Sequence, residues 1–117
     1  MASSLSNNGK NAALNGLAAV AALASAHTAD PGVNGTANEL AGGTPAYARK
    51  AITWGTASGG TVALVATFPV FDVPPATTVA FIGLWTAGAA YLGCFDTTDE
   101  AFVNQGTLTV SAGSVSL

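Results

Sequence analysis

The fold is decided by the uncharged run TTVAFIGLWTAGAAYLGCF at residues 77–95. Its first part, Thr77–Trp85, is rich in the β-branched and aromatic residues that favour strands. Thr86–Gly88 is a turn signal, and Tyr91–Asp96 resumes the apolar pattern. The strongly apolar part, 79–95, is shorter than the roughly 20 residues that a membrane helix needs, and no basic residue flanks it. We therefore expect two strands joined by a turn, and no membrane insertion.

Turns and apolar runs alternate on both sides of this pair. Ser58-Gly59-Gly60 is a hairpin-type turn, and Pro69 interrupts the second of the flanking runs. Further strands are expected at 46–54, 61–71, 107–110 and 114–117, and Asp96, Asp99 and Glu100 are expected in a loop. Short strands with turns every 8–12 residues are typical of a sandwich or barrel. The sequence predicts a mainly β protein, an antiparallel β-sandwich with a short N-terminal helix.

The N-terminal part differs in pattern from the rest. Residues 4–17 read as a helix, which Ser4 can cap and in which Leu14 and Leu17 lie near one face. The alanine-rich segment 20–27 is ambiguous, and we favour a strand. This segment imitates the end of a signal peptide, but the polar start of the chain argues against cleavage. We expect one domain over residues 1–117, with a helix or arm at 1–18 and a β-sandwich at 19–117 that contains a 31–45 loop.

Charge is scarce in this chain. Charged residues make up 8% of it, with 3 Lys or Arg against 6 Asp or Glu and a formal net charge of −3; an ordinary soluble domain has about 25%. Three cations cannot neutralise a run of phosphates. We therefore expect no nucleic-acid partner. Because charge is depleted at the cores of interfaces, we expect partner proteins to cover much of the surface. A secreted domain with a surface of Ser, Thr, Asn and Gly is the alternative.

The groups that catalysis or metal binding requires are few and scattered. Cys94 lies in an apolar run, so we expect a small buried side chain. His27 precedes Thr28 and Asp30, but zinc needs three or four ligands, so the expected role of His27 is a hydrogen bond in a turn. The acids of 96–100 lack the spacing of a calcium loop. We therefore expect a protein that is not an enzyme, with no cofactor and no metal.

Aromatic and basic side chains are the candidates for a protein interface. Most aromatic residues should lie in the core, and any that face outward are natural anchors for a partner. The candidate interface residues are Tyr47, Arg49, Lys50, Trp54 and Trp85. Arg49 and Lys50 can equally belong to an ordinary solvated strand edge.

Several short blocks follow one another in a distinctive order. They are LSNNGKNAAL at 5–14, HTADPG at 27–32, Asn38-Glu39, YARKAITW at 47–54, FDVP at 71–74 and IGLW at 82–85. In this order they resemble a family of small proteins of tailed bacteriophages, especially phages of actinobacteria, that are called tail fibre or minor tail proteins. The resemblance covers nearly the whole chain.

The resemblance implies a β-rich virion subunit and supplies no catalytic residue. We therefore expect a minor tail or tail fibre-type protein that forms homo-oligomers, contacts other tail or capsid subunits and is made in the cytoplasm of the bacterial host. A capsid decoration protein that stabilises the head is one alternative. A carbohydrate-binding module that uses Trp54 or Trp85 is an alternative of another class.

Overall fold

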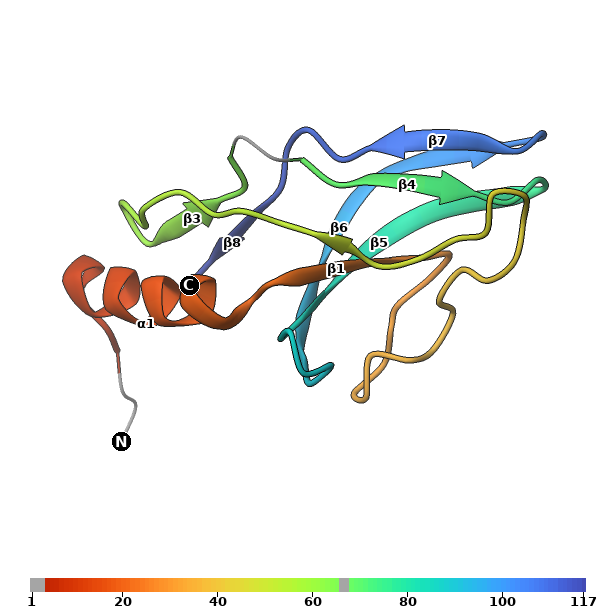
Figure 1. The fold of residues 1–117 in the computed structure, drawn as a ribbon. Helices are drawn as coiled ribbons and strands as arrows, with labels where there is room; N and C mark the ends of the chain where they lie inside the picture. The colour runs from red at the N-terminus through yellow and green to blue at the C-terminus, as the bar shows by residue number, and fades with distance from the viewer. Residues whose placement is uncertain (1–3, 66–67) are drawn as a thin grey trace.

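The computed structural model describes residues 4–65 and 68–117 and is mainly β with one short helix (Figure 1). In chain order the elements are α1 Asn7–Val20, β1 Leu23–His27, β2 Lys50–Ala51, β3 Thr61–Ala63, β4 Val70–Val73, β5 Thr77–Trp85, β6 Tyr91–Phe102, β7 Gly106–Thr109 and β8 Ser114–Ser116. All strand pairs are antiparallel. The predicted fold class is confirmed.

The uncharged run 77–95 forms β5 and the first part of β6 in the largest sheet. Its order is β2-β1-β5-β6, and β4–β7 and β3–β8 form two further ribbons. β5 pairs on one side with β1, from Leu23↔Trp85 to His27↔Phe81, and on the other side with β6. At the expected turn the amide of Ala89 donates to the carbonyl of Thr86. Most residues of β5 are buried, which explains its lack of charge.

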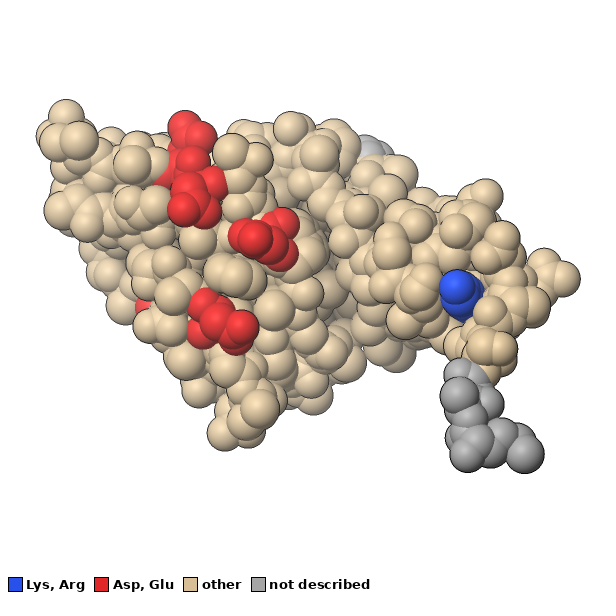
Figure 2. Space-filling view, turned by 180° about the vertical axis from the view of Figure 1, so that it is seen from behind, with Lys and Arg blue, Asp and Glu red and all other residues tan. Residues whose placement is uncertain are grey.

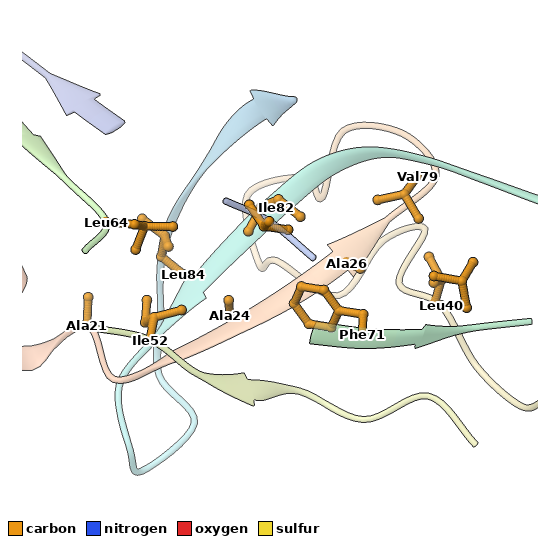
Figure 3. Close-up of a cluster of buried hydrophobic side chains, with 12 residues drawn as sticks. Ala21, Ala24, Ala26, Leu40, Ile52, Leu64, Phe71, Val79, Ile82 and Leu84 are labelled. Carbon is orange, nitrogen blue, oxygen red and sulfur yellow. The ribbon is translucent and has the colours of Figure 1, made fainter. Parts of the chain in front are cut away.

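The main hydrophobic core lies between this sheet and the β4–β7 ribbon. In Figure 3, Phe71 of β4 lies near Ala26 of β1, and Ile82 and Leu84 project from β5. Phe71 and Ile82 are fully buried. Burying such a side chain contributes about 1.5–3 kcal/mol, so this layer contact is a principal source of stability. The two layers give the predicted sandwich its interior.

The helix begins and ends later than expected. Ser6, not Ser4, is the N-cap, and its hydroxyl accepts from the amide of Gly9 at 3.2 Å. At the other end the helix continues to Val20, since the alanines favour it, and β1 starts only at Leu23. The helix is fastened to the 57–60 turn, where the side chains of Asn11 and Asn15 accept backbone amides at 2.9 Å.

The strand expected at 46–54 is mostly wrong, because only β2 and an isolated bridge at Trp54 form there. The outer side of β1 beyond Ala24 is occupied differently: the amide of Leu40 donates to the carbonyl of Ala26, and the amide of Ala26 donates to the hydroxyl of Tyr47. A side chain and a loop thus replace the partner strand.

The remaining strand boundaries follow from β5 and Pro69. The run 61–71 is divided into β3 and β4, as Pro69 predicted, and its residues 66–67 lie outside the described residues. The loop expected around Asp96, Asp99 and Glu100 is wrong, because β6 continues to Phe102. Nine-residue β5 needs a partner along its whole length, and Phe102 pairs with Thr77 at its start.

Two further features bear on the site. The 31–45 segment has no helix or strand beyond the isolated bridge of Glu39 with His27. Among the described residues, no helix has the length and apolar character required to cross a membrane.

Candidate functional site

Tyr47, Arg49 and Trp85 lie together around the carboxylate of Glu39. Arg49 donates from Nε to Oε2 and from Nη2 to Oε1 of Glu39, both at 2.9 Å. The hydroxyl of Tyr47 donates to the same Oε2 at 2.7 Å. The guanidinium carbon of Arg49 lies 3.7 Å from the centre of the Trp85 ring. A two-pronged ion pair and a cation stacked on tryptophan are both strong geometries, so Arg49 is held from two sides.

The charges of this cluster are matched. Burial by itself raises the pKa of the Glu39 carboxyl, but the hydrogen bonds from Arg49 and Tyr47 outweigh it and bring that pKa below its usual value. Burial, together with the hydrogen bond to Glu39, raises the pKa of Tyr47. The hydrogen bond to Glu39 also raises the pKa of Arg49. At neutral pH the cluster is therefore a carboxylate held by one cation and one neutral phenol.

A second network of hydrogen bonds, buried except at its last link, starts from Trp85. Its indole Nε1 donates to Ser25 Oγ at 2.7 Å, Ser25 Oγ lies 2.7 Å from His27 Nε2, and His27 Nδ1 lies 2.8 Å from the carbonyl of Ala37. A carbonyl only accepts, so Nδ1 carries the ring proton and Nε2 accepts from the Ser25 hydroxyl. This tautomer is assigned from the partners. Every side-chain nitrogen and oxygen of Ser25, His27 and Trp85 therefore has a hydrogen-bond partner.

Ser25 and His27 form a serine–histidine contact, but the surroundings do not suit nucleophilic catalysis. Both side chains are 0% exposed, and the Ser25 oxygen already accepts from Trp85. A nucleophile must reach its substrate, and this one is enclosed. A β-carbon at Gly83 would lie within 2.5 Å of Ser25 Oγ. The absence of a side chain at Gly83 therefore leaves room for the network. The network binds Ala37, in the long loop between β1 and β2 (residues 28–49), to β1 and β5.

Lys50 and Trp54 lie apart from this cluster. Lys50 is on β2 opposite Ala24. The indole of Trp54 is half-buried and donates to the carbonyl of Ala21 at 3.0 Å. Trp54 lines an open groove of about 520 Å³ between the end of α1 and residues 52–56. The five candidate interface residues thus divide into the cluster around Glu39 and two separate positions on and beside β2.

One family model identifies the family of this chain. The model described as "Podophage GP4 fiber I protein gp80" matches residues 1–117. The chain belongs to this family. Searches of the curated proteins and of the solved structures found no match. The family is one of phage fibre structural proteins, and the phage resemblance seen in the sequence is confirmed.

In this podophage fibre-family protein, several of the sequence blocks meet in one place. His27 comes from the first block after the helix, Glu39 from the next, Tyr47 and Arg49 from the third and Trp85 from the last. Their side chains form the two connected hydrogen-bond networks. Four of the six blocks, although far apart along the chain, therefore contribute side chains to one tertiary cluster.

Sequence reasoning missed Ser25 and Glu39. Ser25 and His27 are two residues apart, which in a strand places both side chains on one face, opposite Ala24 and Ala26. That spacing was the available signal, and it became informative only once the segment was known to be a strand. Nothing local predicts that Glu39 reaches Arg49. His27 does form a hydrogen bond to a loop carbonyl, in keeping with its expected role.

The surface of the fibre-family protein is acidic along β6. Asp96, Asp99 and Glu100 are exposed there. Figure 2 shows acidic side chains gathered over one face, with Lys and Arg visible only at its far end. Cys94 is also exposed on β6, so its expected burial is wrong: it lies on the edge strand of the sheet, opposite Gly83 and away from the core. Among the described residues, no three His, Cys, Asp or Glu side chains are grouped to hold a metal ion.

Proposed function

We propose that this chain is a non-enzymatic structural subunit of the tail of a phage particle, a tail fibre-type or minor tail protein present in several copies. It is made in the cytoplasm of the bacterial host and works by contacting other virion proteins and further copies of itself. The observation that carries the proposal is the family match over the whole chain. A phage fibre protein associates with other virion components.

The geometry of the buried networks supports a structural role. The polar groups that usually perform chemistry are here paired with one another and with the backbone. Half-satisfied buried networks are costly, whereas fully satisfied ones make a fold unique and rigid. The cluster holds the long loop between β1 and β2 in one position, which is what a subunit with fixed contacts requires.

The same geometry disfavours the carbohydrate-binding alternative. Trp85 is 4% exposed, its indole nitrogen is used and Arg49 lies on its ring. Trp54 lines the open groove beside α1, but its ring is half-buried and its indole nitrogen is used by the carbonyl of Ala21. A sugar platform needs an aromatic face that is open to solvent.

The proposal is tested by immunogold electron microscopy of purified particles of the phage that encodes this chain, with antibody raised against the purified protein. Gold on the tail is the expected result. Antibody absorbed with the purified protein is the control, and it must leave the particles unlabelled.

The other outcomes each decide against the tail assignment. Gold over the head would make the chain a capsid decoration protein. Particles without gold, from a lysate in which the antibody detects the free chain, would refute the structural role altogether.

A further inference from the structure

The outer edge of β6 is open. β6 is 12 residues long and lies at one side of the four-stranded sheet, where it pairs only with β5. Within residues 4–65 and 68–117, no strand pairs with its other side. An open edge presents a row of backbone amides and carbonyls and is a template for pairing with another strand. A long open edge therefore needs an occupant or a means to prevent pairing.

The opposite edge of the same sheet is β2, and its open part is short. β2 pairs with β1 on one side. Further along, a neighbouring segment takes the outer side, since the amide of Val65 donates to the carbonyl of Thr53 at 3.0 Å. The backbone around Arg49 to Ala51 lies before this contact, and the Ala51 side chain is exposed. The open part of β2 is thus long enough for a short strand contact.

The two edges carry opposite charges. Asp96, Asp99 and Glu100 are exposed along β6. Arg49 and Lys50, two of the three basic residues of the chain, lie at β2. Arg49 is paired with Glu39, whereas Lys50 makes no ion pair within the described residues. Complementary charges favour association of unlike edges, with Lys50 as the cation available to the acids of another copy.

The strand directions permit the two edges to meet. Each neighbouring pair in the order β2-β1-β5-β6 is antiparallel, so β2 and β6 run in opposite directions. β6 of a second copy can therefore lie antiparallel beside β2 while both copies keep the same orientation. Pairing of β6 with β6 would instead place acids opposite acids, which is destabilising.

We propose that the open edge of β6 pairs with the β2 edge of a second copy, head to tail, so that the sheet continues from one chain to the next. This inference rests on the proposed structural role and names one of its partners, the chain itself. A contact between unlike patches repeats on every added copy and gives a ring or an open filament.

Cross-linking through the natural Cys94 tests the pairing. The variant Ala51→Cys places a second exposed thiol on β2, and a short bis-maleimide then joins the two edges over a range of registers. The expected result on a denaturing gel is a ladder of dimers, trimers and larger species. The matched controls are the parent chain, which has only Cys94, and Ala51→Cys/Cys94→Ser; neither can extend beyond a dimer.

Two outcomes overturn the inference. A correctly folded Ala51→Cys variant that remains monomeric after cross-linking would show that the edges do not meet. A parent chain that gives as much dimer as the variant, with no higher species, would mean that β6 pairs with itself.

Charge variants distinguish β6–β2 pairing from β6–β6 pairing, because they should change the strength of association in opposite directions. In Asp96→Asn/Asp99→Asn/Glu100→Gln, head-to-tail association should weaken by about threefold for each ion pair lost. The same variant would strengthen β6–β6 pairing, since it removes the repulsion. Lys50→Glu should weaken association as well, whereas Lys10→Glu on α1 should leave it unchanged. Sedimentation velocity at low and high salt measures these changes, and an increase for the triple variant would refute the pairing.

The purified chain suffices for these measurements, so this inference and the proposed function can fail separately. Gold on tails without a ladder would refute only the edge pairing. A ladder without gold on particles would refute only the virion role.

Discussion

Gly83 is a position where one added carbon should disturb a buried hydrogen-bond network directly. A β-carbon there would lie within 2.5 Å of Ser25 Oγ, at 3.0 Å from His27 Nε2 and at 3.2 Å from Trp85 Nε1. All three atoms belong to buried side chains. Neither the ring of His27 nor that of Trp85 can move without loss of a hydrogen bond to Ser25 or Ala37.

The magnitude follows from two effects of Gly83→Ala. Overpacking of a well-packed interior costs about 1–3 kcal/mol. Displacing the Ser25 hydroxyl also leaves buried polar atoms without partners, at about 1–3 kcal/mol. We expect the free energy of unfolding to fall by about 3–5 kcal/mol, a large part of the 5–15 kcal/mol that such proteins have. The melting temperature should fall by about 10 °C or more.

Urea unfolding followed by tryptophan fluorescence and circular dichroism measures the change. Gly16→Ala is the matched control, because a β-carbon at Gly16 meets no atom within 4 Å and the residue lies inside α1. There the same substitution should stabilise by about 0.5–1 kcal/mol, since alanine has the higher helix propensity. The two variants should therefore change stability in opposite directions.

The double variant Ser25→Ala/Gly83→Ala isolates the cause. Ser25→Ala alone should cost about 1–3 kcal/mol, because His27 Nε2 and Trp85 Nε1 lose their partner. It also removes the oxygen that the new methyl group would strike. The double variant should therefore cost less than the sum of the single variants by about 1 kcal/mol or more. A Gly83→Ala protein within about 1 kcal/mol of the parent, or strictly additive costs, would refute this account of the network.

Four further outcomes are expected. The pKa of Glu39 is lower in the folded chain than its value of 4.5 in the absence of the fold, so its stabilising contribution is complete above that pH and is lost as the pH falls through the folded pKa; acid titration of stability should be shallower for Glu39→Gln than for the parent. Tyr47→Phe removes a donor to Glu39 and the acceptor of the Ala26 amide, and urea unfolding should show a loss of about 1–3 kcal/mol. Cys94 is exposed, so a thiol reagent should label it under native conditions, and labelling only in denaturant would contradict its placement. If residues 1–117 are one domain, as the sequence predicts, far-ultraviolet circular dichroism and tryptophan fluorescence should report a single coincident unfolding transition.

Local sequence patterns predicted correctly the strand in which most residues are buried, β5. Thr77–Trp85 was predicted to the residue because a central strand is apolar on both faces. The Thr86 turn and the break at Pro69 were also found, since turn residues act through local geometry. The prediction failed at β2 and at the second half of β6. At these two places the neighbouring segment decides whether a strand forms. Tyr47 and residues 38–40 occupy the edge of β1 where a longer β2 was expected, and pairing with β5 keeps β6 extended as far as Phe102.

The candidate site divides in the same way. The sequence singled out Tyr47, Arg49 and Trp85 by type. It did not predict that Glu39 binds both Tyr47 and Arg49, or that Trp85 donates to the Ser25–His27 pair. Apart from the Ser25–His27 contact, these hydrogen bonds join residues 8 to 60 positions apart. Only packing of the long loop onto β1 and β5 brings them together.

Residue types and their order suffice to predict the fold class, the phage family and the scarcity of charge. Only the packed chain shows which polar groups are buried together, that Cys94 is exposed, and that Asp96, Asp99 and Glu100 lie at one edge of the main sheet and Lys50 at the other. The physical reason is that burial and hydrogen bonding depend on neighbours in space. In an antiparallel sheet those neighbours are set by strand order, which local patterns do not encode.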